Sequence, residues 1–210
     1  MIKGLDKRFG LSLLIGLISL IAACSSQPIV INHYLLNISD PAAGEIIEND
    51  SDLSILITDI LLPDYLNSSN LVMQQENGIL SVATKHVWAQ PLDSGFGTLL
   101  ANSLNEQDGL IAFYGAHNAG IMKVFSANSD VQLAIVVEHF MPIGTGEVVL
   151  IGYWQSAAKD AMAKPKRFEF RRSLEADGYI HSVEKMRMLV KDLADTISDE
   201  LLKETAHLKS

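Results

Sequence analysis

The alternation of hydrophobic and polar positions predicts several short β-strands in the first half of the chain. Residues 29–38, 53–60 and 110–114 are rich in β-branched and aromatic side chains, and turn-forming or polar residues flank them. Pro63 follows the second segment and ends it, because proline has no N–H to donate to a strand ladder. The first half is therefore expected to be mostly β-structure.

The sharpest turn signal is Asn77-Gly78, which lies between the apolar segments 70–75 and 79–84. An Asn-Gly pair between two strand-like runs is typical of a tight β-hairpin, because both residues accept left-handed backbone angles. The sequence therefore predicts a hairpin here.

A second hairpin, of longer strands, is predicted for residues 131–140 and 147–155. These runs flank the Gly-Thr-Gly sequence at residues 144–146. Residues 166–174 alternate aromatic with charged side chains, which is typical of an edge strand with one solvated face.

Two segments have helical periodicity. The first runs from residue 92 to 105, with Asp93 as the expected N-cap, and its apolar stripe consists of Phe96, Leu99, Leu100, Ser103 and Leu104. The second runs from residue 181 to 208, contains neither Gly nor Pro, and is amphipathic, with a stripe formed by Met186, Val190, Leu193, Ile197 and Leu201. The order of elements predicts an α+β fold, with a mixed, largely antiparallel sheet and two main helices.

The composition fits one ordered domain. The 210 residues are 48% hydrophobic and carry a formal net charge of -9, which makes disorder improbable. An acidic chain does not suit nucleic acid, whose phosphates require a basic surface. It is equally unsuited to being held on an anionic membrane by charge alone.

The N-terminus has the pattern of a secretory leader. Residues 1–10 are basic, and residues 11–23 are an apolar run that is shorter than the roughly 20 residues a membrane span needs. Cys24 follows at once. As the only cysteine, it excludes an intrachain disulfide and a thiolate metal cluster. We expect a leader at residues 1–23, a polar tether at residues 24–28 and a single domain at residues 29–210.

The residues around the cysteine, Ile21-Ala22-Ala23-Cys24, resemble a bacterial lipobox, in which the thiol receives diacylglycerol. A lipidated Cys24 carries enough acyl chain for stable anchoring, which one chain alone does not give. Ser25 and Ser26 resemble residues that permit export to the outer membrane. The alternative is a soluble secreted protein with an ordinary cleavage site and a free cysteine.

Catalytic signals are weak. The chain has no Gly-x-Ser-x-Gly elbow, its six histidines lack the spacing of a zinc helix, and Gly95-Phe96-Gly97 is not a complete phosphate-binding motif. Asp59 and Asp64 form a hypothetical acid–base pair, but carboxylates are common in an acidic protein and are weak evidence for catalysis. We therefore predict no catalytic residue, no metal and no cofactor.

Residues 164–172 hold a cluster of basic side chains in this acidic chain: Lys164, Lys166, Arg167, Arg171 and Arg172. The cluster has two interpretations. It is either a contact for an acidic partner or lipid headgroups, or a set of charges that keeps an edge strand soluble.

Two sequence blocks carry a family resemblance. The block Leu62-Pro63-Asp64-Tyr65-Leu66 and the block Val87-Trp88-Ala89-Gln90-Pro91-Leu92-Asp93 resemble the PqiC/YmbA family of ABC-transport auxiliary lipoproteins. The lipobox, the Tyr34-Leu35-Leu36 strand, the strand from Gly146 to Trp154, the segment Phe168 to Tyr179 and the terminal helix follow in the family's order. Asn67, Ser68 and Gln90 stand where many members carry charges, which leaves polar contacts at those positions open.

The resemblance implies an outer-membrane lipoprotein that works with an inner-membrane-anchored MCE-domain protein of the PqiB type to move lipids across the periplasm. This chain would dock to or cap that partner, self-associate around it and perform no covalent chemistry. Rival interpretations are a purely structural envelope lipoprotein and an enzyme with an unrecognised site.

The turn formed by Pro63, Asp64, Tyr65 and Leu66 is a candidate partner contact, as is the basic strand. Tyr65 fits an interface and the core equally well. Trp88, with Pro91 and Asp93, is interpreted as a structural motif at the start of a helix, and the core is the favoured place for its indole.

Overall fold

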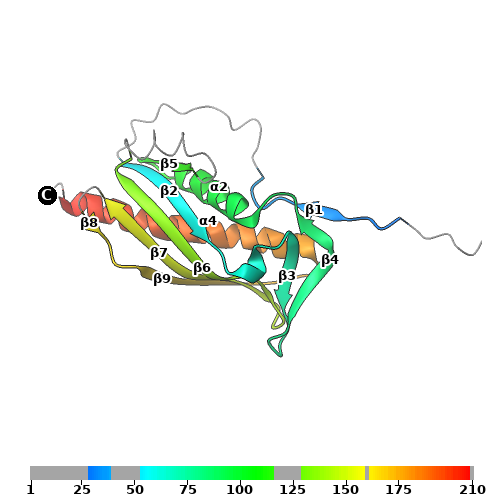
Figure 1. The fold of residues 1–210 in the computed structure, drawn as a ribbon. Helices are drawn as coiled ribbons and strands as arrows, with labels where there is room; N and C mark the ends of the chain where they lie inside the picture. Colours follow the sequence, from blue (N-terminus) through cyan, green and yellow to red (C-terminus); the bar gives the residue numbers. More distant parts are fainter. Residues whose placement is uncertain (1–27, 39–52, 116–128, 159–160, 209–210) are drawn as a thin grey trace, which may run out of the picture. The chain divides into compact units, whose positions relative to one another are not determined.

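The computed structural model describes residues 28–38, 53–115, 129–158 and 161–208 (Figure 1). The chain divides into Met1–Val30 and Ile31–Ser210, and the second is the compact unit that holds all of the described elements. In chain order these are β1 (Asn32–Tyr34), β2 (Leu53–Leu61), the 3-10 turn η2 (Asp64–Leu66), β3 (Asn70–Gln74), β4 (Leu80–Trp88), α2 (Leu92–Asn105), β5 (Leu110–Tyr114), β6 (Val131–Ile143), β7 (Glu147–Ala158), β8 (Ala161–Met162), β9 (Lys166–Ser173) and α4 (Tyr179–Leu208).

The strands of the described chain form one mixed sheet, in the order β1-β4-β3-β6-β2-β5, and β7 pairs with β6, β8 and β9. The longest ladders, β6 with β7 and β7 with β9, are antiparallel. The pairings of β1 with β4 and of β2 with both β5 and β6 are parallel. The predicted α+β class with a mixed, largely antiparallel sheet is confirmed.

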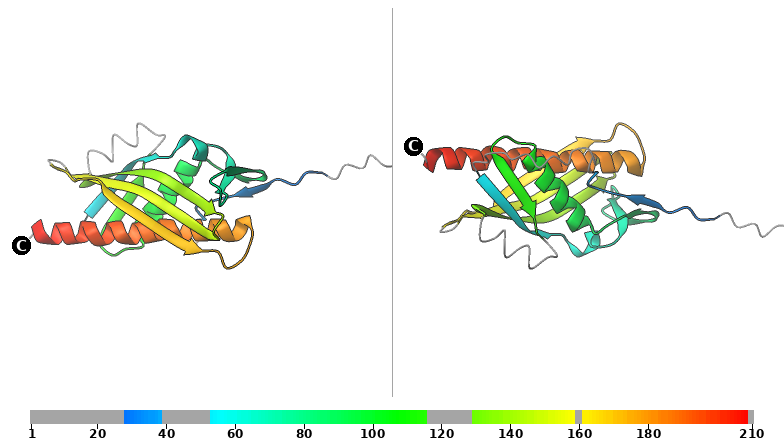
Figure 2. Two further views of the ribbon diagram at one scale, coloured as in Figure 1. Left: turned by 90° about the horizontal axis from the view of Figure 1, so that it is seen from below. Right: turned by 90° about the horizontal axis from the view of Figure 1, so that it is seen from above.

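Helices α2 and α4 contact each other and lie on the same face of the sheet (Figures 1 and 2). The predicted stripe of α4 is buried at every position, because this face of the helix packs against the sheet. The core between the layers includes Ile55, Ile57, Leu133, Ile135 and Leu150 from the central strands. Neither helix in the described residues is long and apolar enough to cross a membrane.

Both predicted hairpins are present. In the first, the Gln75 N–H donates to the Ile79 carbonyl at 2.8 Å, and Gly78 has a φ of +81°. That angle explains why the sequence places glycine at this position. Strand β4 continues without a break to Trp88, beyond the end that the sequence suggested.

The predicted strand at residues 29–38 is wrong in extent, because only Asn32–Tyr34 is a strand. Strand β1 pairs with the last three residues of β4, and it pairs with no other strand among the described residues. Beyond β1, the carbonyls of Leu35 and Leu36 accept hydrogen bonds from Arg187 of α4, at 2.8 and 3.0 Å. Burial lowers the pKa of this guanidinium, opposed by the charge of Glu184.

The prediction of Asp93 as an N-cap is also wrong. Helix α2 begins at Leu92, its N-cap residue is Pro91, and Asp93 lies in the first turn. The helix therefore begins two residues earlier than it would with Asp93 as its N-cap. At its actual position the Asp93 carboxylate still faces the positive end of the helix dipole.

Tyr114 at the end of β5 lies against Gly97 of α2. A Cβ at position 97 would come within 2.5 Å of the Tyr114 ring, so glycine allows this close approach. Burial of the phenol, together with the charges of Asp93 and Asp59, raises the pKa of Tyr114 to about 12. The Gly-Phe-Gly sequence therefore serves helix–strand packing.

We expect this phenol to make the domain sensitive to alkali. The folded state keeps Tyr114 protonated up to about pH 12, whereas the unfolded chain loses the proton near pH 10, so stability falls between those values. The shift corresponds to about 2.7 kcal/mol, which solvent screening of a half-buried ring reduces to about 1 kcal/mol. In urea unfolding experiments, the free energy of unfolding of Tyr114→Phe should fall by about 1 kcal/mol less than that of the parent between pH 10 and pH 12. Equal losses in both proteins would contradict this cause.

Candidate functional site

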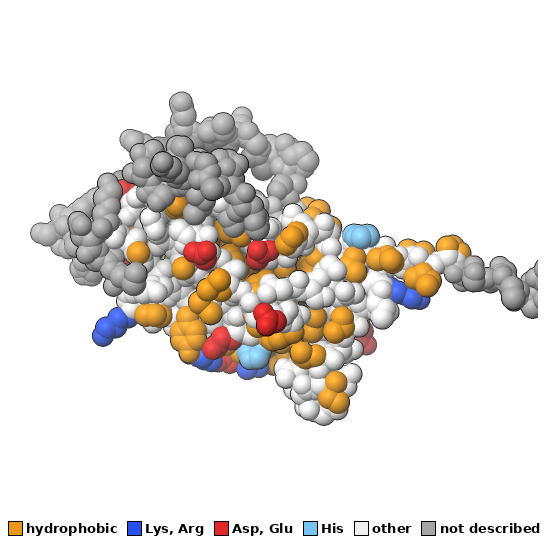
Figure 3. All heavy atoms as spheres, viewed as in Figure 1, with side chains coloured by type: hydrophobic (Ala, Val, Ile, Leu, Met, Phe, Trp, Pro, Cys, Tyr) orange, Lys and Arg blue, Asp and Glu red, His pale blue; other side chains and the backbone are white. Residues whose placement is uncertain are grey.

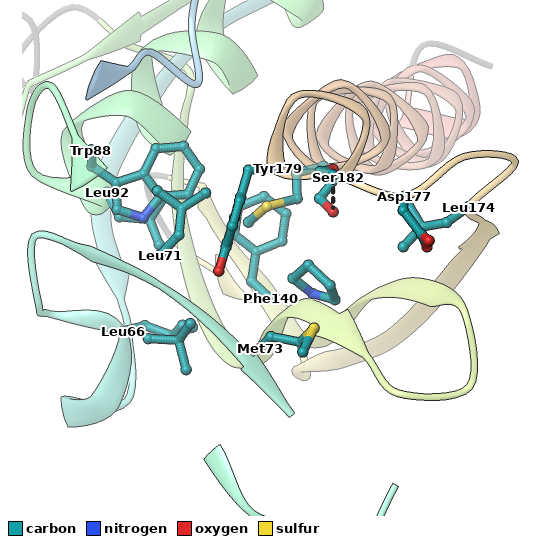
Figure 4. A pocket seen from close by; sticks show the side chains of 14 residues that line it. Leu66, Leu71, Met73, Trp88, Leu92, Phe140, Leu174, Asp177, Tyr179 and Ser182 are labelled. Carbon is teal, nitrogen blue, oxygen red and sulfur yellow. Dashed lines mark hydrogen bonds between the residues drawn. The ribbon is translucent and has the colours of Figure 1, made fainter. Parts of the chain in front are cut away.

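An apolar pocket of about 260 Å³ opens where β3, β4 and the end of β6 meet the start of α4 (Figure 4). Its remaining walls come from η2, the beginning of α2 and the loop between β9 and α4. The lining residues are Leu66, Leu71, Val72, Met73, Trp88, Leu92, Phe140, Pro142, Leu174, Asp177, Gly178, Tyr179, Ser182 and Met186.

The lining is almost entirely hydrocarbon and aromatic. Among the lining residues, Trp88 and Phe140 are buried, with relative exposures of 7% and 0%. The Ser182 hydroxyl already donates to the Gly178 carbonyl at 3.2 Å, and the Asp177 carboxylate is exposed. Such a surface accepts an apolar group and offers few hydrogen-bonding partners to a polar one.

The pocket exists because the sheet is incomplete beside it. Strand β2 pairs with β6 only as far as Leu61, opposite Val136. Strand β3 joins β6 only at Gln74, opposite Ile143. In the described chain, no strand pairs with this edge of β6 between those two points. The side chains of β3 and β6 therefore line a space rather than pack together.

The candidate partner turn, residues 63–66, follows the end of β2 directly. Pro63 and Tyr65 are half-buried, Asp64 is exposed and Leu66 is buried at 4% exposure. The Leu66 side chain belongs to the core and to the pocket wall. The prediction that Leu66 contacts a partner at the surface is therefore wrong. The other three remain candidates.

Tyr65 caps the unpaired edge of β6. Its hydroxyl donates to the Glu138 carbonyl at 2.8 Å and lies 3.2 Å from Nδ1 of His139. Burial raises the pKa of this phenol. The Tyr65 hydroxyl therefore satisfies the Glu138 carbonyl, which lies beyond the end of β2. The half-exposed ring is available at the surface.

A second aromatic group holds the other side of the pocket. The His86 ring stacks on Tyr179 with centroids 3.8 Å apart, and the Tyr34 hydroxyl lies 2.8 Å from Nδ1 of His86. These three residues come from β4, α4 and β1 respectively. They fix Tyr179, which is one wall of the pocket, against the edge of the sheet.

The basic strand β9 is neutralised within the molecule. Its cations pair with carboxylates of β6, β7, β9 itself and α4, as follows: Lys166 with Glu200 and Glu204, Arg167 with Glu138 and Glu169, Arg171 with Glu147 and Glu169, and Arg172 with Asp192. The interpretation as a contact for an acidic partner or lipid headgroups therefore stays a prediction. These ion pairs favour the alternative, in which the charges keep the edge strand soluble.

The other candidate residues fall in several places. Cys24, Ser25 and Ser26 lie outside the described residues. Trp88 is buried, as the core interpretation predicted. Asp59 and Asp64 are both exposed, and the described side chains contain no group of three His, Cys, Asp or Glu residues that could hold a metal ion.

Sequence reasoning missed the pocket because six of its fourteen lining residues come from the loop before α4 and from the start of that helix. Asp177, Gly178 and Ser182 carry no recognisable motif, and they reach β3 only through the tertiary fold. One signal was present: Gly178 has a φ of +119°, so a glycine directly before a helix marked a tight loop.

Comparison with known proteins gives consistent relatives. The Intermembrane transport lipoprotein PqiC of Escherichia coli is 23% identical over 182 residues, which cover 86% of this chain and 91% of that protein. The protein of the same name from Shigella flexneri matches equally. Neither name is that of an enzyme.

Solved structures share the fold. A crystal structure of an uncharacterized protein matches with a TM-score of 0.66 and 20% identity over 82% of this chain and 99% of its own. A Xanthomonas campestris protein matches with a TM-score of 0.63 and 13% identity over 85% of this chain and all of its own. The family model of the ABC-type transport auxiliary lipoprotein component matches residues 34–198, which include every wall of the pocket. The chain therefore belongs to the family of ABC-type transport auxiliary lipoproteins.

Proposed function

We propose that this protein is an outer-membrane lipoprotein subunit of an MCE-type intermembrane lipid transport system. It docks to or caps the periplasm-spanning MCE partner and supports the integrity of the envelope. The observation that carries the proposal is the family match over residues 34–198, together with relatives that are named intermembrane transport lipoproteins.

The leader and Cys24 supply the anchor in this proposal. Residues 1–23 direct export, and acylation of Cys24 ties the domain to the membrane through the tether at residues 24–28. Ser25 and Ser26 permit transfer to the outer membrane. The protein performs no covalent chemistry and needs no cofactor.

The partner contact centres on the turn after β2. Asp64 is exposed and Tyr65 is half-exposed, so both side chains are available to a docked protein. The charged side chains of β9, Lys166, Arg167, Arg171 and Arg172, contribute only if a partner carboxylate replaces an internal one. A tyrosine fixed by a hydrogen bond is the kind of rigid anchor that interfaces favour.

Self-association is part of the proposal. A single domain of this size does not surround a tubular partner, and a closed ring needs the same heterologous interface repeated around its axis. Strand β9 pairs only with β7, so in the described chain it leaves one edge beside alternating positive and negative side chains. Alternating charge allows two acidic copies to meet there despite their net repulsion.

Replacing Cys24 with Ala should release the domain from the outer membrane or leave it as an unprocessed precursor. No other segment then holds it, since the apolar run at residues 11–23 is too short for a stable span. Membrane separation on a density gradient, with immunoblotting for precursor and mature forms, measures the outcome. A Cys24→Ala protein that still fractionates as a mature outer-membrane species would refute the anchor.

The alternative is a structural envelope lipoprotein without a transport role. It shares the same anchor, so fractionation does not separate the two functions. Affinity purification from crosslinked membranes does, because only the transport subunit brings down an MCE-domain protein.

A further inference from the structure

The apolar pocket is the feature of the described fold that the docking role leaves unexplained. Its volume of about 260 Å³ lies just below the range of about 300–1,000 Å³ typical of sites for drug-sized ligands. It is therefore too small for a whole phospholipid. It matches one narrow apolar group, such as the end of a single acyl chain.

The lining suits an aliphatic chain better than a peptide. A peptide inserts backbone groups that need hydrogen-bonding partners. Here the Ser182 hydroxyl already donates its hydrogen bond to the Gly178 carbonyl, and Pro142 has no N–H that could donate one. Met73 and Met186 supply flexible, unbranched side chains, which adapt to a mobile chain.

Exposed apolar side chains lie beside the pocket on the β3–β4 hairpin. Met73, Leu80, Val82 and Ile79 are 37%, 40%, 54% and 57% exposed, and hydrophobic side chains over this hairpin are visible in Figure 3. Val82 pairs directly with Val72, which is part of the pocket wall. A hydrocarbon chain could therefore pass from the hairpin surface into the pocket along apolar contacts.

The anchor brings this hairpin close to a membrane. Cys24 lies eight residues before Asn32 of β1, so a fully extended tether spans at most about 28 Å. Strand β1 pairs with β4, which is one strand of the hairpin. The described chain therefore enters the sheet at the edge that carries this hairpin.

We propose that this pocket binds a single aliphatic lipid chain, which enters across Met73, Leu80 and Val82. The inference rests on the proposed function, because lipidated Cys24 is what holds the pocket at a membrane. Two sources supply the same chemistry: a phospholipid of the bilayer and the acyl chains on Cys24 itself. The exposed carboxylate of Asp177 at the edge disfavours an anionic head group and suits a zwitterionic one.

Quenching of Trp88 fluorescence tests the proposal. The chain has two tryptophans, so Trp154→Phe leaves Trp88, in the pocket wall, as the only one. This lipidated protein is reconstituted in phosphatidylcholine vesicles whose acyl chains carry bromine, which quenches indole fluorescence on contact. Trp88 should lose about half of its emission relative to unbrominated vesicles.

Two variants separate pocket entry from simple contact with the bilayer. Val72→Phe fills the pocket from β3, and Ser182→Leu fills it from α4, so each should abolish the quenching. Met188→Phe is the control, because Met188 is 43% exposed on α4 and lies neither in the pocket lining nor on the proposed entry path. Circular dichroism and melting identify any filling variant that fails to fold. Quenching that survives both folded filling variants would overturn the proposal.

A protein without acyl groups of its own identifies the source of the bound acyl chain. A mature chain with Cys24→Ser and an N-terminal histidine tag is tethered to the same vesicles through nickel-chelating lipid. Quenching in both proteins assigns the site to bilayer lipid, and quenching only in the tagged protein assigns it to the chains on Cys24. Quenching in neither protein overturns the proposal. Because purified protein is used, the result is independent of capture of an MCE partner.

Discussion

Trp88→Ala should destabilise the domain by about 3 to 5 kcal/mol, the usual cost of truncating a buried aromatic side chain. The indole is 7% exposed, belongs to the main core and ends β4. Its backbone N–H also donates to the Ser69 carbonyl at 2.7 Å, which ties the end of β4 to the segment before β3. Loss of the ring therefore removes contacts between the hairpin and α2, and chemical denaturation measures the loss.

Tyr65→Ala is the informative comparison. The ring is half-buried and its hydroxyl donates to Glu138, so we expect a cost of about 1 to 2 kcal/mol. Tyr65→Phe removes only the hydrogen bond and should cost about 1 kcal/mol. Both variants should remain folded, while Tyr65→Ala weakens partner capture. If Tyr65→Ala unfolds the domain as severely as Trp88→Ala, the turn is core and its docking role is wrong.

Gly152→Ala is the second substitution with a large expected effect. Gly152 lies in the middle of β7, between Val137 of β6 and Phe168 of β9. A Cβ here would collide with the Val136 carbonyl oxygen and would lie 2.8 Å from Cζ of Phe168. A backbone carbonyl in a paired strand does not move aside cheaply, so the expected loss is about 3 kcal/mol.

Gly146→Ala is the matched control for this prediction. Gly146 has a φ of +81°, but no heavy atom lies within 4 Å of a Cβ built there. Its substitution carries only the conformational cost of about 1 to 2 kcal/mol. Melting both variants separates collision from backbone strain. A Gly152→Ala protein as stable as Gly146→Ala would contradict the close packing of β6, β7 and β9.

Local signals in the sequence predicted most of the elements. Helix α4 follows from a continuous stripe without Gly or Pro, and the hairpin at Gly78 follows from its Asn-Gly pair, because each signal is carried by neighbouring residues. The parallel pairing of β2 with β5 and β6 was not predictable in this way. Hydrophobic periodicity shows which face of a strand is buried, but it does not identify the partner strand.

The candidate site was predicted less completely, for the same reason. The sequence shows the basic residues of β9 as a cluster of cations but does not show their ion pairs, because Asp192, Glu200 and Glu204 lie on α4, far along the chain. The pocket depends on where β2 stops and where β3 rejoins β6. Pro63 indicated where β2 ends, but no local feature indicated where β3 rejoins β6.

The proposed role depends most on the partner. The native chain, tagged at its C-terminus, is purified from chemically crosslinked membranes, with the Cys24→Ala chain carrying the same tag as the unanchored control. Mass spectrometry should find an MCE-domain protein enriched with the native chain over that control. A native chain that is anchored in the outer membrane but brings down no MCE-domain protein above the control would contradict a docking subunit of a lipid transport system.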